Sequence, residues 1–306
     1  MALGASVIVV VALIALFGYY QTKVRPKGET VLEVGTRSFS LDYAERRLRY
    51  DFSQGIGSVY QSDPTAAPTN LLNEIENEEL LRQGAPEKGV DLSEGAIDAA
   101  IREREKVPAN ADLNTFAAAY RQAVLDSGLS TQGYRDVVAA DVASKAIQPM
   151  FLAEAPKTAD QVRFRVIVLS TEDAAKAALQ RLQNGEDFAT VAKEVSQHAA
   201  SAQQGGEQDW TPRGILEPVL DQALFSLEIN QISDVLAGNS AYFIVQVEER
   251  QDQRDTTDTQ RSALANQAQQ AWIKGLADRL GVATTLSASH QASILSIVQS
   301  ELQKGQ

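Results

Sequence analysis

The hydrophobic and polar positions of this 306-residue chain follow three different patterns. Residues 2–20 contain no charged side chain and form one continuous apolar run. From about residue 30 to 155, successive segments carry their apolar residues on one side at helical spacing, which predicts a helical domain. Further on, near residue 162, apolar residues begin to alternate with arginines, which is typical of a strand with one buried face.

The apolar run over residues 2–20 is long enough, as a helix, to cross a bilayer core of about 30 Å. Tyr19 and Tyr20 close it, where interfacial aromatic residues are expected. We therefore predict an uncleaved transmembrane anchor that contacts the lipid bilayer and crosses it once. A cleaved signal peptide is the alternative, although no A-x-A-like cleavage site follows the run.

The charges next to this run are compatible with a body of the protein on either side of the membrane. Basic residues follow the apolar run closely, at Lys23, Arg25 and Lys27. Taken literally, the positive-inside rule keeps the body of the protein in the cytoplasm. The rule weakens when a long domain follows the span, so an extracytoplasmic body remains compatible with the sequence.

A change of pattern at Val162 marks the start of a second folded region. In the segment VRFRVIVL, apolar residues alternate with Arg163 and Arg165, which predicts a strand with one charged face. Helical segments, a Gly-Gly loop and two short strands, QISDVL and AYFIVQVEE, follow in order. This order predicts a compact α+β domain with a small antiparallel sheet.

The last part of the chain is predicted to form helices. Over residues 257–280, apolar side chains recur at every fourth position, which favours packing on another helix over a solvated tail. The predicted organisation therefore has four parts: a transmembrane anchor, a helical domain, an α+β domain, and C-terminal helices with a tail, at residues 2–20, 21–160, 161–250 and 251–306.

Composition and charge exclude several kinds of partner and of reactive or metal-binding site. With a formal net charge of −12 and no stripe of basic and aromatic residues, the chain would repel a phosphate backbone, so nucleic acid is not expected as a partner. The lack of cysteine excludes disulfides, thiolate nucleophiles and cysteine-bound zinc. His198 and His290 lie far apart, without metal-ligand spacing or a nucleophile-elbow context. We therefore expect no metal and no cofactor.

Residues 184–210, NGEDFATVAKEVSQHAASAQQGGEQDW, carry an ordered series of small, acidic and aromatic positions. A glycine precedes an acidic residue and a phenylalanine, small residues follow on a helix, and a Gly-Gly-acid stretch leads to an aromatic residue. The segment RGILEPVLDQALFSLEINQIS then supplies Arg-Gly, Pro, Ala and Phe. In the order and spacing of these features the chain resembles the parvulin family of peptidyl-prolyl isomerases. The matching residues include Gly185, Asp187, Phe188, Ala192, Ser196, Gly205, Gly206, Glu207 and Trp210.

The helical part that precedes this region resembles the N-terminal region of the SurA/PrsA-type foldases. The similarity lies in LLNEIENEELLRQGAPEKGVDLSEGAIDAAI and in LDSGLSTQGYRDVV. The resemblance implies a SurA-like helical chaperone domain that carries the parvulin-like domain, with a C-terminal helix packing back on the helical domain. It also implies an extracytoplasmic body, and unfolded or proline-containing polypeptides as partners.

The resemblance to parvulins also assigns positions in a proline-binding cleft. Leu216, Leu220 and Phe225 match the family's proline-pocket positions, and all three are apolar. Gly205 and Gly206 are expected to supply backbone conformations that side chains would forbid, in a loop that borders the cleft.

The two facing histidines of the parvulin family are absent from this chain. By the resemblance they correspond to Val166 in the first strand and Phe243 in the last, so both positions become apolar substrate-binding positions. His198 and Ser240 are the remaining polar candidates for a catalytic role. His198 is either a relocated polar contact or an exposed loop histidine.

These observations predict a membrane-anchored, extracytoplasmic folding factor that binds unfolded clients and whose isomerase activity is weak or lost. Prolyl isomerisation needs no nucleophile or cofactor, because the catalyst only has to bind the twisted amide better than the planar one. Two alternatives stay open. One is an active isomerase with a reshaped pocket around His198, and the other is a non-catalytic interaction subunit of a membrane complex.

Overall fold

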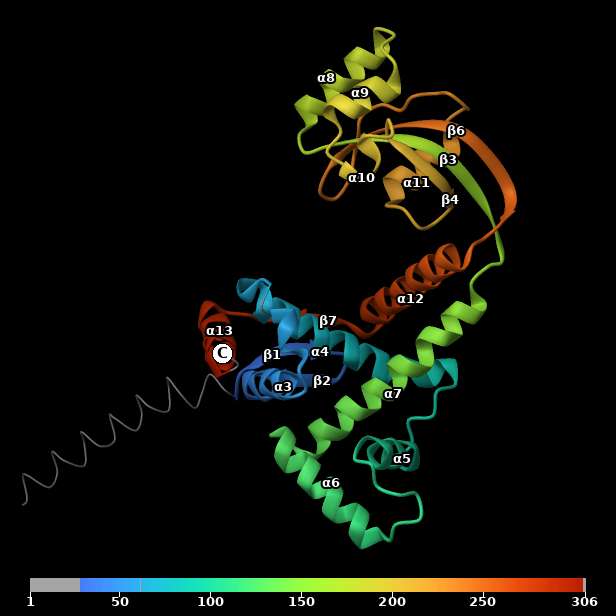
Figure 1. The fold of residues 1–306 in the computed structure, drawn as a ribbon. Coiled ribbons are helices and arrows are strands. Elements are labelled where there is room, and N and C mark those ends of the chain that lie inside the picture. Colours follow the sequence, from blue (N-terminus) through green and yellow to red (C-terminus); the bar gives the residue numbers. More distant parts are fainter. Residues whose placement is uncertain (1–27, 61, 305–306) are drawn as a thin grey trace, which may run out of the picture. The chain divides into compact units, whose positions relative to one another are not determined.

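The computed structural model describes residues 28–60 and 62–304, whose course is shown in Figure 1. The predicted transmembrane anchor over residues 2–20 lies outside this range. Among the helices that the structure describes, none combines the length and the apolar character needed to span a bilayer. The chain divides into two compact units. The helical unit comprises the chain up to Ile147 together with the part from Ala271 onward, and the sheet unit comprises residues 148–270.

The helical unit combines helices with a small three-stranded sheet. In this sheet β1 lies between β2 and β7, and both pairings are antiparallel. The strands are β1 (Thr30–Val34), β2 (Arg37–Ser40) and β7 (Val282–Thr284). The helices are α3 (Leu41–Ser53), α4 (Ala67–Gly84), α5 (Glu94–Arg104), α6 (Leu113–Ser127), α7 (Thr131–Glu154), α12 (Asp258–Leu280) and α13 (Ala288–Lys304), with 3₁₀ turns η2 (Ile56–Tyr60), η3 (Pro64–Ala66) and η4 (Ala85–Lys88). Since α7 and α12 each continue into the sheet unit, the domain limits drawn from the sequence stay predictions.

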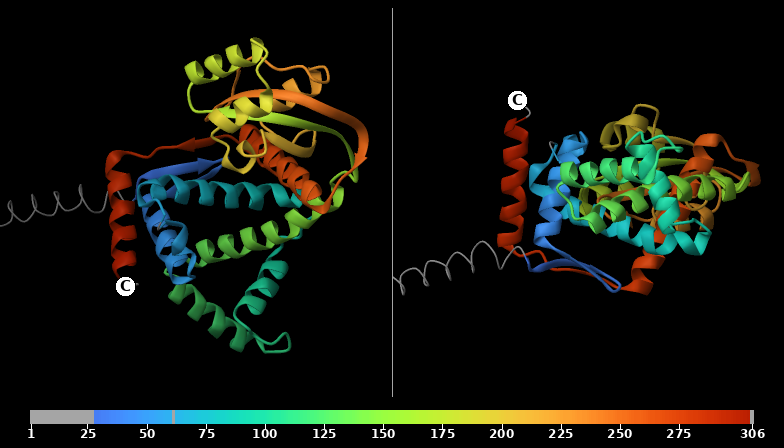
Figure 2. Two further views of the ribbon diagram at one scale, coloured as in Figure 1. Left: turned by 45° about the horizontal axis from the view of Figure 1, so that its top comes forward. Right: turned by 90° about the horizontal axis from the view of Figure 1, so that it is seen from below.

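The C-terminal helix α13 packs on the first helices of the same unit. It lies against α3 and α4, and both views of Figure 2 show the red helix α13 beside the blue part of the chain that contains α3. Ser293 Oγ in α13 donates a hydrogen bond to Glu45 of α3 at 2.5 Å. Leu276, near the end of α12, packs so closely on Gly84 of α4 that an added Cβ at Gly84 would lie 2.4 Å from its Cδ1. The C-terminal segment is therefore part of the core of the helical unit.

The sheet unit holds a four-stranded antiparallel sheet in the order β4-β3-β6-β5. Its strands are β3 (Thr158–Leu169), β4 (Glu207–Pro212), β5 (Leu236–Ala237) and β6 (Tyr242–Asp255). Its helices are α8 (Glu172–Gln183), α9 (Phe188–Val195), α10 (Ala199–Ala202) and α11 (Pro218–Ser226). Figure 1 shows α8 and α9 on one side of the sheet and α11 on the other. The predicted α+β class, with a helical N-terminal part and small antiparallel sheets, is confirmed.

Strand β3 gives the sheet a core on each side. Val166 faces α11, whereas Ile167 and Leu169 are buried against α8 and α9. Arg165 precedes this apolar end of the strand, and its Nε donates a hydrogen bond to the carboxylate of Glu248 on β6 at 2.6 Å. The charged face that the alternation predicts is therefore short, and the end of the strand is buried on both faces because helices cover both sides there.

Candidate functional site

One continuous apolar surface on the sheet forms the centre of the candidate site, and we call it the apolar floor. It is made by one face of β3 and β6 together with α11. In the register of the two strands, Val166 lies opposite Val245, and Val168 lies opposite Phe243. Since side chains alternate along a strand, Val166 and Phe243 are diagonal neighbours on the same face. The buried members of the floor are Val162, Phe164, Val166, Leu220, Leu224, Val245 and Val247.

The structure brings all of the predicted substrate-binding residues to this floor. Helix α11 begins at Pro218 and turns Leu220 and Leu224, four residues apart, toward the sheet. The partly buried side chains at its edge leave apolar surface open to a ligand. The predicted residues found together here are Val166, Leu216, Leu220, Phe225 and Phe243. That they bind a substrate stays a prediction.

Two arginines at the edge of the apolar floor were not among the site residues predicted from the sequence. The guanidinium carbon of Arg213 lies 4.0 Å from the centre of the Phe225 ring, and that of Arg250 lies 6.0 Å from it. Guanidinium groups are attracted to aromatic faces. Arg250 Nη2 also donates to the carbonyl oxygens of Leu224 and Leu227, at 2.7 and 2.8 Å. The Arg-Gly pair of the parvulin-like pattern is a signal for Arg213, whereas no local pattern points to Arg250.

The two polar candidates lie outside the apolar floor. His198 is exposed at the start of the short helix α10, and its Nδ1 lies 2.7 Å from Oγ of the buried Ser201. Ser240 is exposed in the turn between β5 and β6. This turn does approach the floor, because a Cβ added at Gly238 would lie 2.3 Å from the Phe243 ring. The structure therefore brings the turn with Ser240 close to the floor. Gln197, next to His198, donates its N–H to the carbonyl oxygen of Val168 at 2.8 Å, and Val168 packs on the floor. A catalytic role for His198 or Ser240 stays a prediction.

The Gly-Gly loop lies directly on strand β3. Gly205 and Gly206 have φ values of +70° and +81°, which favour glycine. A Cβ added at Gly206 would lie 2.4 Å from the carbonyl oxygen of Val166, and the Gly206 carbonyl accepts a hydrogen bond from the Val166 N–H at 2.9 Å. Gly205 accepts a further bond from Arg165 Nη1 at 3.1 Å. The loop thus fixes the backbone of Val166, one of the floor residues.

The chemistry of this site is that of a hydrocarbon surface with a guanidinium at its edge. Such a surface suits an apolar ring or side chain, because burial of apolar area is favourable. Within residues 28–60 and 62–304, no three or more His, Asp and Glu side chains are grouped in a way that would hold a metal ion.

The sequence matches two family models. Residues 153–251 match the model described as the PPIC-type PPIASE domain, and residues 1–148 match the SurA-like N-terminal domain. The first match contains β3, α11 and most of β6, and therefore the whole apolar floor.

Known proteins with similar sequences are foldases and chaperones. The chain is 26% identical to the foldase protein PrsA of Caldanaerobacter subterraneus subsp. tengcongensis, over 58% of this chain and 56% of that protein. It is 36% identical to the periplasmic chaperone PpiD of Haemophilus ducreyi, over 28% of this chain and 14% of that protein. The solved structure of a peptidylprolyl isomerase (PrsA) from Bacillus anthracis aligns at a TM-score of 0.42 and 21% identity, covering 74% of this chain and 95% of that one. The chain spans about half, or less, of the length of these two curated relatives.

Proposed function

We propose that this chain, which carries a PPIC-type parvulin domain and a SurA-like N-terminal domain, acts as a foldase of the PrsA, SurA and PpiD type. It binds unfolded or proline-containing polypeptides and keeps them from aggregating, while its isomerase activity is weak or lost. The apolar floor is the surface in the sheet unit that contacts the client.

The observation that carries this proposal is the pair Val166 and Phe243 on one face of the sheet. Rotation about a peptide bond has a barrier of about 18–20 kcal/mol, and a catalyst lowers it by binding the twisted amide better than the planar one. Hydrocarbon side chains hold a proline ring but donate no hydrogen bond, so they stabilise both states alike. Uniform binding of this kind supports capture of a client without accelerating its isomerisation.

The exposed edge of the floor supports the binding half of the proposal. Leu216 and Phe225 are only partly buried, and Arg213 covers one face of the Phe225 ring. A guanidinium beside apolar side chains offers a client both a hydrophobic contact and a donor for its backbone carbonyl groups. This combination favours extended polypeptide segments over small charged metabolites.

Membrane anchoring and an extracytoplasmic body belong to the same proposal. The apolar run over residues 2–20 supports the anchor, and the relative named a periplasmic chaperone supports the location. Membrane fractionation with alkaline extraction, followed by protease treatment of intact and opened cells, tests both. Release by alkali or protection of the body inside the cytoplasm would overturn this part.

The test of the catalytic half compares the full chain with the variant Val166→His/Phe243→His. We expect no acceleration of the cis-to-trans reaction of an X-Pro peptide by the native chain, and at least about tenfold acceleration by the double variant, because the imidazoles restore polar contacts to the twisted amide. The two single variants serve as controls for a nonspecific effect of histidine. A clear acceleration by the native chain would show that activity is retained.

If the native chain is active, Arg213 and His198 become the groups to dissect. A rate that follows a pH profile lost in His198→Ala would support the reshaped-pocket alternative. The chaperone half is tested separately, by the suppression of aggregation of an unfolded client. Failure to suppress aggregation of any client would overturn it.

A further inference from the structure

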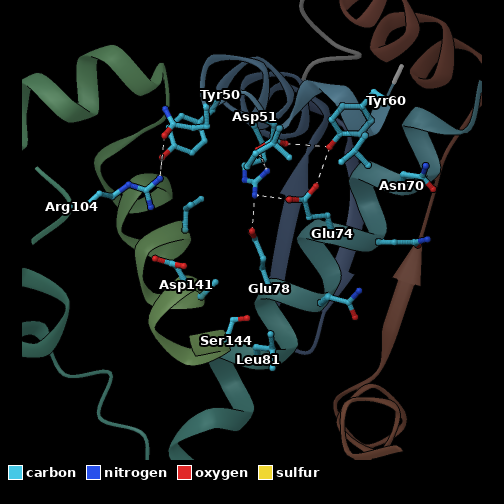
Figure 3. Close-up of a pocket in the computed structure, with 18 residues that line it drawn as sticks. Tyr50, Asp51, Tyr60, Asn70, Glu74, Glu78, Leu81, Arg104, Asp141 and Ser144 are labelled. Atoms are coloured by element: carbon cyan, nitrogen blue, oxygen red, sulfur yellow. Dashed lines mark hydrogen bonds and ion pairs between the residues drawn. The ribbon is translucent and has the colours of Figure 1, made fainter. Parts of the chain in front are cut away.

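The helical unit contains a concave surface that shares no residue with the parvulin-like site. It is a cavity of about 530 Å³ bounded by α3, α4, α7 and the η2 turn, and we call it the acidic pocket (Figure 3). At the bottom of this pocket, the side chain of Arg47 is 3% exposed. Its guanidinium pairs with Asp51, with Glu74 at 3.1 Å and with Glu78 at 2.6 Å. Tyr60 covers this group and donates its hydroxyl to Glu74 at 3.0 Å.

The acidic pocket holds more negative than positive charge. Four carboxylates line it against two guanidinium groups. The second guanidinium, that of Arg104, is directed to the hydroxyl of Tyr50 at 2.5 Å. Glu74 and Asp141 are both partly open to solvent, with side chains 34% and 41% exposed. Asp141 also pairs with the exposed Lys145 at 2.8 Å, so the four carboxylates outnumber the cations next to them by one. The most solvent-exposed of the paired carboxylates, Glu74 and Asp141, are the ones that an entering cation meets first.

Two carboxyl groups of the pocket have raised pKa values, first because they are buried and then because other carboxylates lie near them. Burial raises the pKa of Asp51 to about 7 and that of Glu78 to about 7, although Arg47 lowers both. Neighbouring carboxylates raise them further. Adding a cation from outside relieves this repulsion, since an opposite charge within about 4–6 Å favours the ionised carboxylate.

The rim of the pocket is apolar and amide-rich. Ile56 and Val59 of η2 are 41% and 57% exposed. On α4, Asn70, Asn73 and Asn77 are exposed and line the same cavity. Amide side chains both donate and accept hydrogen bonds, as a peptide backbone does. Apolar side chains beside solvent-accessible carboxylates match a lysine or arginine, whose aliphatic stem packs on hydrocarbon while its charged head remains in a polar environment.

We propose that the acidic pocket binds the lysine or arginine side chain of an unfolded polypeptide, with the α4 amides contacting the neighbouring backbone. This deepens the proposed function and rests on it, because it names the class of side chain that the client presents. A bare metal ion is a poorer match, because the residues that the structure describes contain no ligand cluster for one. A client with the opposite charge would be repelled by the surplus carboxylates.

The test uses the full chain and two fluorescent unstructured peptides that differ only at one position, lysine or norleucine. We expect the lysine peptide to bind about fivefold tighter or more, and this preference to shrink at high salt. In Glu74→Gln/Asp141→Asn the preference disappears while norleucine-peptide binding is unchanged. The control Glu76→Gln/Glu103→Gln removes the same charge from positions outside the pocket and retains the preference.

Each outcome separates this inference from the proposed function. Equal binding of the two peptides, or an equal loss in the control variant, overturns the acidic pocket as a cation site. If aggregation of a client is still suppressed in that case, the proposed function stands. If neither peptide binds and no client is protected, both fail. Asp141→Asn alone keeps the test valid should Glu74→Gln fail to fold, because Asp141 is partly exposed and its ion pair is with the exposed Lys145.

Discussion

The apolar floor and the acidic pocket are candidate binding surfaces built by opposite physical means. The floor consists of hydrocarbon from two paired strands and one helix, so it stabilises the sheet unit as well as offering a surface. The pocket buries Arg47 among three carboxylates, and taking charges out of water costs more than packed hydrocarbon would. Buried charge of this kind is weak support for a structural role. The binding role proposed for the pocket agrees with this difference.

The largest expected effect on stability comes from removing Arg47, the buried cation of the acidic pocket. Arg47→Leu leaves Asp51, Glu74 and Glu78 without their partner, and we expect a loss of about 3–5 kcal/mol in the stability of the helical unit. Hydrogen exchange resolved by segment, with the sheet unit as internal reference, measures it. The exposed Arg49→Leu is the matched control and should cost less than about 0.5 kcal/mol. Equal effects of the two substitutions would remove the contrast between pocket and floor.

The next effect concerns the backbone behind the apolar floor. Gly206→Ala places a Cβ against the carbonyl oxygen of Val166 in a left-handed conformation, so we expect a loss of at least about 2 kcal/mol in the sheet unit. Gly214→Ala also has a positive φ but has open space around it, and should cost only about 1 kcal/mol. Denaturant unfolding monitored by segment gives both values. A similar cost at the two glycines would mean that the loop does not need its close contact with β3.

A smaller effect is expected from pH, and only in the helical unit. The carboxyls of Asp51 and Glu78 have folded-state pKa values of about 7, above those of an unfolded chain near 4. The folded state therefore binds these protons more tightly, and stability rises as pH falls from about 8 to about 5. The charged and titratable groups around them are Arg47, Tyr60, Glu74 and Asp141.

The measurement is the midpoint of unfolding of the helical unit against pH. Asp51→Asn is expected to flatten the profile, since the asparagine does not titrate while Arg47 keeps Glu74 and Glu78 as partners. Lysine-peptide binding should weaken over the same fall in pH, because protonation removes the surplus negative charge. A profile that stays unchanged in Asp51→Asn would assign the pH dependence to groups elsewhere.

The smallest effect on stability is expected from an exposed ion pair, and it tests whether burial or charge alone makes Arg47 important. Arg163 on β3 pairs with Glu207 and Glu249 on the outer side of the sheet, where these side chains are partly exposed. Arg163→Gln should change stability by less than about 1 kcal/mol, since exposed pairs contribute little. Thermal unfolding of the full chain measures it. A loss comparable to that of Arg47→Leu would show that burial is not what makes the pocket arginine important.

The sequence predicted the floor better than the pocket, for a physical reason. Val166 and Phe243 lie in alternating strand segments, where the pattern itself states which residues share a face. Arg47 meets Glu74 and Glu78 across two helices, 27 and 31 residues apart in sequence, and each helix alone resembles an ordinary solvated one. The usable signal was the like-charged pair Glu74 and Glu78 at i, i+4, which is unfavourable unless a cation comes from elsewhere.

The direction of the His198 ring lay beyond prediction as well. Its partner, Ser201, is only three residues away, so the local sequence permits the contact but does not require it. The arginines at the edge of the floor were missed for the same kind of reason. Arg250 reaches the end of α11 only after β6 has paired with β3, and that pairing joins segments about 80 residues apart.

The order of segments in the chain has a consequence for synthesis. β1 leaves the ribosome before the sheet unit, but one of its edges is paired by β7, which comes after the entire sheet unit. Until then β1 presents free backbone groups and the surface of α3 that α13 later covers is bare. The sheet unit, in contrast, has all of its strands in one continuous stretch and is able to complete its fold first. The nascent helical unit is thus itself an unfinished polypeptide with open edges for as long as translation of the inserted segment lasts.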